Sequence, residues 1–226
     1  MGLLERSYCR IERALRLCNA AGWVGIQSLG LGLLDPEELV RLTVERFESS
    51  SYLDPAYIRS GLWLWEREAL RRFFPTSGRI LVGAAGAGRE MLALHRTGYT
   101  VEGFECAHTL VDAGQAILRD EGCPGQLIWS PACTVPTMEG QFDGAIMGWS
   151  GYMYIPLRIQ RVELLRTFRG LLRYGAPLLL SFQTREQCER RTYWSARCAN
   201  WVRKIRGVQP VLTGDYLDNG FKHWFN

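Results

Sequence analysis

Glycine and alanine fill one short segment of the chain, Gly83-Ala84-Ala85-Gly86-Ala87-Gly88, directly after the apolar run Arg79–Gly83. Small residues let a ligand approach the backbone closely, and glycine adopts the positive φ angles that a sharp turn needs. The spacing is G-x-x-G-x-G, which differs from the G-x-G-x-x-G of dinucleotide-binding proteins. Between a strand and a helix, this segment predicts a cradle for a small ligand, made by Gly83, Ala84, Gly86 and Gly88.

An acidic residue, Glu105, ends the next apolar run, 17 residues after Gly88. A carboxylate at that place can accept hydrogen bonds from both hydroxyls of a ribose. If that is its role, replacing Glu105 by alanine weakens ligand binding. We expect the same change to leave the stability of the ligand-free protein almost unaltered.

Short apolar runs alternate with helical patterns from Gly78 onward. We expect strands at 79–83, 100–104, 126–129, 142–147 and 176–182, and helices at 90–96, 108–118 and 157–172. Fully apolar strands that alternate with helices indicate a parallel sheet covered by helices on both faces. The sequence therefore predicts an α/β fold with a doubly wound, mostly parallel sheet, whose ligand lies beyond the carboxyl ends of the strands.

The first 76 residues have the pattern of helices and turns. Gly22, Gly25 and the glycine-rich stretch 29–34 interrupt the first helical pattern, and Asp35-Pro36 begins a new helix. A further helix is expected to end at Phe74. We divide the chain into an N-terminal helical extension over 1–76, which acts as a lid, and a ligand-binding domain over 77–226.

Between about Gly78 and Gln183 the ordered motifs resemble the class I S-adenosylmethionine-dependent methyltransferases. The motifs are the glycine-rich loop, the acid after the second strand, a proline-containing turn over 131–136 and Gln141-Phe142-Asp143 before the fourth strand. The resemblance implies a Rossmann-like fold, methyltransferase activity and S-adenosylmethionine as the cofactor. It implies that the methionine part lies on the 83–88 loop and the ribose on Glu105. It also places the adenine beside Cys106, Ala132 and Cys133.

This family often has an acid near the end of the first strand, where Val82 stands, and an aspartate at the adenine, where Pro131 stands. It also often has glycine at the position of Ala84. Backbone groups of Ala132 and Cys133 can serve the adenine in place of the aspartate.

Aromatic residues gather in two places that this resemblance assigns to the substrate side. Trp149 and Tyr152 follow the fourth strand, where members of the family place residues that face the substrate, and Gly148 before them is expected at the cofactor. Tyr52 and Tyr57 precede the sheet, where relatives carry helices that cover the cofactor. Aromatic walls exclude water from a sulfonium and stabilise it by cation–π contact. We expect Tyr152 and at least one of Tyr52 and Tyr57 to face the same cavity.

A strong general base is optional, because the sulfonium methyl is already activated and alignment is the main requirement. Of the three histidines, His223 lies in a segment that resembles the one closing over the substrate in small-molecule methyltransferases. We therefore take His223 as the candidate base and Tyr152 as the second catalytic candidate. We expect His95 and His108 to be structural.

Composition narrows the class of protein. The net charge of +4 over 226 residues is too small to require a polyanionic partner. Seven cysteines without a C-x-x-C pair favour reduced thiols in the cytoplasm and give no metal motif. No apolar run approaches the ~20 residues that span a bilayer, so no membrane insertion is expected.

Residues 185–206 contain seven basic and two acidic residues, with Tyr193, Trp194 and Trp201 interleaved. Such a segment can bind RNA phosphates and stack on bases, or form an ordinary solvated helix face. We favour methyl transfer to a small molecule that carries a hydroxyl or an amine. The alternatives are an RNA methyltransferase that uses this basic segment, and a catalytically silent domain that contacts other proteins.

The last predicted strand of the sheet, 176–182, is followed by few residues. Only 43 residues come after Gln183, too few for every element that the family adds there. We expect 176–182 to be an apolar edge strand of a shortened sheet. The competing possibility is a terminal hairpin on that edge, made by 208–213 and 221–225.

Overall fold

Five parallel strands form the central sheet of the computed structural model, which describes residues 3–48, 51–184, 189–218 and 220–225. Their order is β3-β2-β1-β4-β5. The strands are β1 (Arg79–Gly83), β2 (Thr100–Glu105), β3 (Gln126–Trp129), β4 (Gly144–Met147) and β5 (Leu178–Leu179). The strand order reverses between β1 and β4, and such a point is where open α/β sheets bind ligands. The predicted α/β class and the five strand positions are confirmed.

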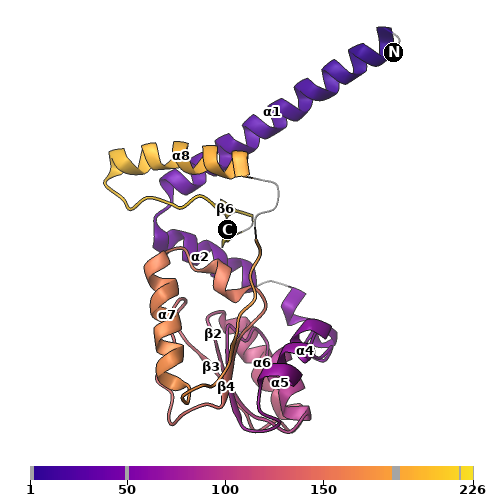
Figure 1. The fold of residues 1–226 in the computed structure, drawn as a ribbon, viewed down its shortest axis with the longest axis vertical. Helices are drawn as coiled ribbons and strands as arrows, with labels where there is room; N and C mark the ends of the chain where they lie inside the picture. The colour runs from indigo at the N-terminus through magenta and orange to yellow at the C-terminus, as the bar shows by residue number, and fades with distance from the viewer. Residues whose placement is uncertain (1–2, 49–50, 185–188, 219, 226) are drawn as a thin grey trace.

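Helices cover both faces of the sheet, and the side chains of β1 alternate between the two cores. Ile80 and Val82 pack with α5 (Arg89–Arg96) and α6 (His108–Asp120). Leu81 points to the other face and packs with Phe168 of α7 (Arg158–Leu171). Figure 1 shows α7 on one side of the strands and α4 (Leu64–Phe73), α5 and α6 on the other. The continuous apolar run of β1 is therefore buried on both sides.

The first helix, α1 (Leu3–Leu33), is continuous, so the predicted interruption by glycine is wrong. A Cβ at Gly30 would lie 2.4 Å from Cδ1 of Leu217, and one at Gly32 would lie 3.1 Å from Cβ of Val202. These glycines therefore permit close packing and do not break the helix. Figure 1 shows α1 crossing α8 (Glu189–Arg206) at the end of the molecule away from the central sheet.

A third apolar cluster joins the first helices to the last part of the chain. Leu31 of α1 and Leu39 of α2 (Pro36–Glu48) pack with Ala199 of α8 and with Phe221. The guanidinium of Arg203 donates hydrogen bonds to the carbonyls of Leu31 and Leu34, which satisfies backbone acceptors at the end of α1. The division of the chain at residue 76 stays a prediction.

The C-terminal strands form their own antiparallel pair, β6 (Asp215–Leu217) with β7 (Phe221–His223). The alternative of a hairpin on the edge of the central sheet is therefore wrong. The pair meets the segment after β5 through Phe225. The backbone N–H of Phe225 donates to the carbonyl of Gln183, its backbone forms a bridge with Thr184, and its ring packs on Phe182.

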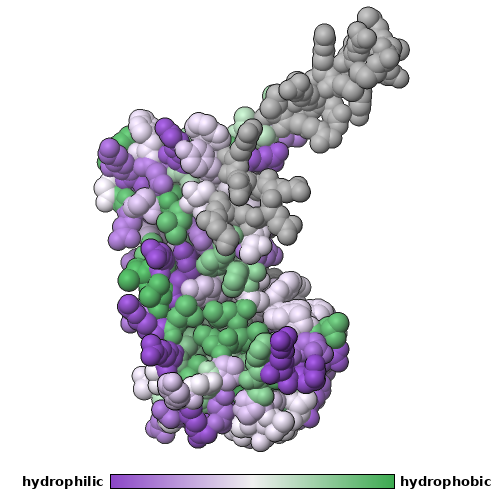
Figure 2. Space-filling model, in the orientation of Figure 1, coloured by the Kyte–Doolittle hydropathy of each residue, from purple (hydrophilic) through white to green (hydrophobic). Residues whose placement is uncertain are grey.

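β5 is an edge strand as expected, but of the predicted run 176–182 only two residues pair with β4. Figure 2 shows hydrophobic residues gathered beside α7, on the side where β5 lies. Leu178, Leu179 and Leu180 are half-buried there, and Phe182 is exposed. None of the described helices combines the length and the apolar character needed to cross a membrane.

The remaining elements are short; two lie between α2 and α4, and the third follows β4. They are η1 (Ser51–Leu53), α3 (Pro55–Ile58) and η2 (Gly151–Tyr154). The helix expected to end at Phe74 corresponds to α4, and the short helix α3 stands apart from it. Gly61 between them has a φ of 85°, in the left-handed region that favours glycine.

Candidate functional site

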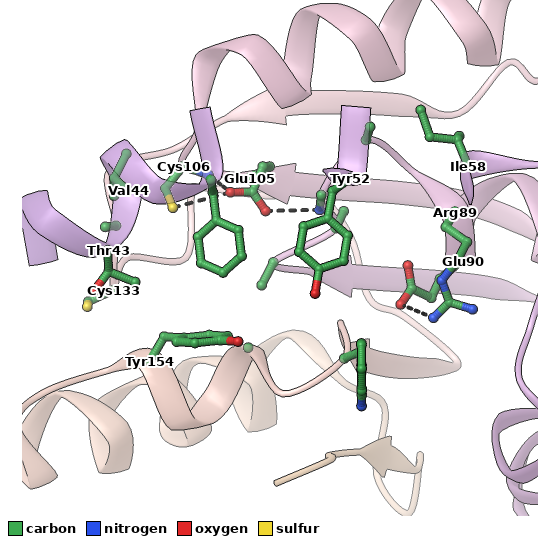
Figure 3. Close-up of a pocket in the computed structure, with 18 of the residues that line it drawn as sticks. Thr43, Val44, Tyr52, Ile58, Arg89, Glu90, Glu105, Cys106, Cys133 and Tyr154 are labelled. Atoms are coloured by element: carbon green, nitrogen blue, oxygen red, sulfur yellow. Dashed lines mark hydrogen bonds and ion pairs between the residues drawn. The ribbon is translucent and has the colours of Figure 1, made fainter. Parts of the chain in front are cut away.

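A cavity with an empty volume of about 800 Å³, including its open mouth, lies at the carboxyl ends of β1, β2 and β4. The loop after β1 forms one wall, and α2 and η2 supply side chains around it (Figure 3). The lining is mainly apolar and aromatic, with a few charged groups. A cavity of this composition at the reversal of strand order is the preferred place for a ligand in this architecture.

The glycine-rich loop leaves part of its backbone open to the cavity. Gly86 has a φ of 55°, and a Cβ built on it would meet nothing within 4 Å. Ala84 and Gly86 line the cavity, whereas Gly83, Gly88 and Gly148 do not. A Cβ at Gly148 would lie only 2.1 Å from the carbonyl oxygen of Ala84, so this glycine is required for packing.

Glu105 joins the end of β2 to the glycine-rich loop. Its Oε2 accepts the backbone N–H of Gly86 at 2.9 Å. Its Oε1 accepts the backbone N–H of Cys106 at 2.7 Å and of Ala107 at 3.0 Å. A carboxylate has about four lone-pair positions, so Oε2 retains one for a ligand hydroxyl while Oε1 is fully used. Three backbone donors depend on Glu105, which argues against the expectation that its replacement leaves the ligand-free protein almost unaltered.

Cys106, Ala132 and Cys133 line the same cavity at the ends of β2 and β3. Burial raises the pKa of the Cys133 thiol to about 11. Burial, together with the negative charge of Glu105, also raises the pKa of Cys106. Both thiols are therefore uncharged near neutral pH and form an apolar surface, without the thiolate that a nucleophile requires.

Tyr52, Tyr57 and Trp149 line the cavity, as does Tyr154, which the sequence reasoning missed. Figure 3 shows Tyr52 and Tyr154 reaching into the cavity from opposite walls. The rings of Tyr52 and Tyr57 meet edge to face with centroids 5.1 Å apart. Burial raises the pKa of both Tyr57 and Tyr154 to about 12. Their hydroxyls therefore remain protonated near neutral pH.

Tyr152 does not line the cavity, so the expectation that it faces Tyr52 and Tyr57 is wrong. Its ring stacks on Phe225, with centroids 5.5 Å apart. Tyr152 and Tyr154 both belong to η2, a 3₁₀ helix with three residues per turn. Residues two apart in such a helix point in different directions, and Tyr154 is the one directed into the cavity.

His223 also lies outside the cavity lining. Its Nδ1 is 2.6 Å from Oδ1 of Asp215, and both side chains are buried within the β6–β7 pair. Phe225 packs edge to face against the imidazole. The structure therefore does not bring His223 or Tyr152 together with the residues of the glycine-rich loop.

Two charged residues in the first turn of α5, Arg89 and Glu90, line the cavity and were not among the predicted site residues. Arg89 forms two bonds to Glu66, Nη2 to Oε1 at 2.6 Å and Nη1 to Oε2 at 2.9 Å. Its Nη2 also lies 2.6 Å from Oε1 of Glu90. One feature of the sequence could have pointed to these two residues. They are adjacent charges at the start of a helix whose next four residues, Met91–Leu94, are apolar and buried.

α2 covers the cavity and is fastened on two sides. Glu48 accepts the backbone N–H groups of His108 at 2.8 Å and Thr109 at 2.9 Å, at the start of α6. Thr43 accepts the backbone N–H of Phe221 at 2.8 Å. Burial acts to raise the pKa of Glu48, but hydrogen bonds from the side chain of Thr109 and from the backbone N–H groups of Thr109 and His108 lower it. Val40, Thr43, Val44 and Phe47 of the fastened helix line the cavity.

No protein-family model and no curated protein sequence matches the chain. Among solved structures, an S-adenosylmethionine-dependent methyltransferase from Methanosarcina mazei is 18% identical, with a TM-score of 0.55. That match covers 73% of this chain and 79% of the other. The glycopeptide N-methyltransferase MtfA is 25% identical with a TM-score of 0.45, and the match covers 54% of each chain.

The CcbJ methyltransferase from Streptomyces caelestis is 16% identical with a TM-score of 0.45, over 56% of this chain and 55% of the other. The chain thus spans about half the length of MtfA and of CcbJ. The match to the Methanosarcina protein extends over 73% of this chain and 79% of the other, and the central sheet of this chain is parallel with helices on both faces. The chain therefore has the Rossmann-like fold of the S-adenosylmethionine-dependent methyltransferases.

Proposed function

We propose that the protein transfers a methyl group from S-adenosylmethionine to a small molecule that carries a hydroxyl or an amine. One observation supports this proposal above the others: six of the residues expected at the cofactor line a single cavity at the carboxyl ends of the strands. These residues are Ala84, Gly86, Glu105, Cys106, Ala132 and Cys133.

The residues along the cavity suit the parts of that cofactor in order. The apolar surface of Cys106 and Cys133, at the ends of β2 and β3, would hold the adenine. The free lone pair on Oε2 of Glu105 would accept one ribose hydroxyl. The open backbone at Gly86 would leave room for the methionine part. In this arrangement, Gly83, Gly88 and Gly148 act by shaping the loop and not by contact.

S-Adenosylmethionine supplies an already activated methyl group when it is bound. The chain then has to align the acceptor with that methyl group and to exclude water. Tyr52, Tyr57 and Trp149 would form the wall on the acceptor side, and α2 with Tyr154 would cover the cavity. A base role for His223 or Tyr152 stays a prediction, and neither residue lines this cavity in the structure.

Calorimetric titration with S-adenosylhomocysteine tests the proposal, and we expect one binding site per chain. Gly86→Val should abolish binding, because the new side chain fills the open space beside the loop. Gly122→Val is the matched control. Gly122 also has a positive φ, 68°, and open space around its Cβ position, but it does not line the cavity. Both variants carry similar backbone strain, so only a loss confined to Gly86→Val supports the site.

Absence of binding by the wild-type protein to both S-adenosylmethionine and its product would contradict the proposal. That result would favour the catalytically silent alternative. Mass spectrometry of ligands that co-purify with the natively isolated protein would identify the acceptor class directly.

An RNA acceptor is the second candidate, and one surface favours it. Trp194 and Trp201 of α8 are 51% and 69% exposed, and Arg197 lies over the Trp194 ring. This surface lies on α8 and contributes nothing to the cavity lining. Residues 185–188 of the basic segment lie outside the described residues. Salt-dependent binding of tRNA, lost in Trp201→Ala, would promote this candidate.

A further inference from the structure

Three buried charged side chains form a cluster at one end of the cavity. Glu66, Arg89 and Glu90 are 1%, 2% and 4% exposed. The cluster contains two carboxylates and one guanidinium, so it carries one excess negative charge when all three groups are ionised. Burying an uncompensated charge is costly.

The pairing within the cluster is unequal. Glu66 receives both terminal nitrogens of Arg89 and also the backbone N–H of Trp63, at 2.6 Å. Glu90 shares only one of the same nitrogens, and it accepts the backbone N–H of Trp149. Arg89 is thus neutralised by Glu66 through a two-point contact. Glu90 is the carboxylate whose charge has no cation of its own among the described residues.

The cluster is incompletely satisfied on its donor side as well. Nε of Arg89 is buried and has no hydrogen-bond partner in the described part of the chain. Burial raises the pKa of Glu90, the positive charge of Arg89 opposes this, and Glu66 adds to it. In the ligand-free protein, the carboxylate of Glu90 therefore lacks the stabilisation that a paired ion would have.

Glu90 also faces the cavity. It lines the cavity, whereas Glu66 does not. Figure 3 shows Arg89 and Glu90 at one end of the row of lining side chains and Cys133 at the other, with Glu105 and Tyr52 between them. This placement follows from the topology, because Trp149 follows β4 and Cys133 follows β3, on opposite sides of β1 in the strand order.

A purely structural role explains all the contacts of Glu66, whereas for Glu90 it explains only the hydrogen bond from the backbone N–H of Trp149. The contact between Glu66 and Arg89 already ties α4 to α5, and Nη1 of Arg89 adds a bond to the carbonyl of Gly61 at 2.6 Å. The second carboxylate adds no further tie between these elements. It adds a negative charge at the cavity wall.

Building on the proposed function, we propose that Glu90 is the receptor for a positively charged ammonium group of a bound ligand. Glu66 and Arg89 position its carboxylate. Two ligands could supply this group: the cofactor, through the α-amino group of its methionine part, or the acceptor, through an amine. An anionic group is disfavoured at this end, because it would add to the existing excess of negative charge.

The first experiment compares S-adenosylhomocysteine with 5′-methylthioadenosine, which lacks the amino-acid part, by calorimetric titration. If the ammonium comes from the cofactor, Glu90→Gln should weaken S-adenosylhomocysteine binding by ~10- to 100-fold, the loss expected for one hydrogen bond to a charged group. Binding of 5′-methylthioadenosine should change less than about twofold. Glu68→Gln, on the exposed side of α4, is the control and should alter neither.

The second experiment tests the acceptor as the source. Protein saturated with S-adenosylhomocysteine is titrated with benzylamine and with benzyl alcohol, its neutral counterpart. If the acceptor supplies the ammonium, the wild type should prefer the amine by ~10-fold or more, and Glu90→Gln should lose this preference. Its affinity for S-adenosylhomocysteine should then equal that of the wild type.

The proposal is overturned if Glu90→Gln keeps the wild-type affinity for S-adenosylhomocysteine and also the wild-type preference between benzylamine and benzyl alcohol. It is also overturned if the variant weakens S-adenosylhomocysteine and 5′-methylthioadenosine equally. If Glu90→Gln does not fold, the wild type is titrated instead with S-adenosylhomocysteine and with its deaminated α-keto acid. The proposal is overturned if the wild type binds these two equally well and also binds benzylamine no more tightly than benzyl alcohol.

Failure of the proposed function has a different signature, because the wild type then binds neither nucleoside. In that event, benzylamine and benzyl alcohol are compared on the ligand-free protein. Equal binding of the two still overturns the role of Glu90.

Discussion

Removing the carboxylate of Glu105 should destabilise the protein even when no ligand is present. The side chain accepts three backbone N–H groups, from Gly86, Cys106 and Ala107. A hydrogen bond to a charged group contributes about 1.5–3 kcal/mol, and a buried donor left without a partner costs about 1–3 kcal/mol. Gly86 lies at the cavity, where water can replace the carboxylate, whereas Ala107 is fully buried. We therefore expect Glu105→Ala to lower the free energy of unfolding by about 2–4 kcal/mol.

Urea unfolding followed by tryptophan fluorescence measures this loss. For a chain of this length, about 2–4 kcal/mol corresponds to a fall in Tm of roughly 4–16 °C. Glu105→Gln should lie between wild type and alanine, because its carbonyl oxygen still accepts the N–H groups of Cys106 and Ala107. Its amide nitrogen, however, would face the N–H of Gly86.

Glu102→Ala is the matched control on the same strand. Glu102 pairs with Arg79 in a half-buried position, and a pair of that kind contributes about 0–1 kcal/mol. If Glu105→Ala unfolds within about 0.5 kcal/mol of the wild type, or no more easily than Glu102→Ala, the three hydrogen bonds do not support the loop as we argue.

Three further changes separate packing, covering and charge at the cavity. Gly148→Ala should give little folded protein in a solubility assay, because its Cβ would overlap the backbone oxygen of the loop at 2.1 Å, whereas Gly86→Ala, with open space around it, should remain folded. Tyr154→Ala should weaken S-adenosylhomocysteine binding by ~10-fold in calorimetry. Tyr152→Ala should instead lower the free energy of unfolding by about 3–5 kcal/mol and leave the affinity for S-adenosylhomocysteine unchanged. The reverse pattern would refute the placement of Tyr154 in the cavity and of Tyr152 outside it. Glu48 has a lowered pKa, so its contribution to stability should be complete above its ordinary pKa of 4.5 and disappear as the pH falls through the lowered value. The free energies of unfolding of the wild type and of Glu48→Gln should therefore converge in acid. A difference that stays constant with pH would contradict this role.

The sheet could be predicted because its strands are short apolar runs separated by helical patterns. The boundaries of 79–83 and 126–129 agree with β1 and β3. The apolar run at 176–182 also predicts a strand, yet only Leu178–Leu179 pair with a neighbouring strand. Apolar character records burial and not hydrogen bonding, so an edge segment that is partly covered has the same sequence pattern as a strand. The continuity of α1 was missed for a related reason. Gly30 and Gly32 are needed for close packing against neighbours more than 150 residues away, which the local sequence does not show.

The candidate site was predictable where small residues and backbone geometry define it. Ala84, Gly86 and Glu105 follow strands, and the ends of parallel strands meet at one edge of the sheet. Tyr154 was missed because the phase of a single 3₁₀ turn decides which tyrosine faces the cavity. Glu90 was missed because its excess charge appears only when Glu66, 24 positions earlier, lies against Arg89.

The pairing of α1 with α8 has a consequence for how the chain is made. The hydrogen bonds between these helices join residues 167 to 174 positions apart. A ribosome adds about 5–20 residues per second, so α1 emerges roughly 8–35 s before the helix that covers it. The sheet and its flanking helices can assemble in that interval from neighbouring segments, whereas Leu31 of α1 waits for its partners in α8. α1 is thus synthesised well before the helix it packs against, and it reaches its place only after α8 has been made.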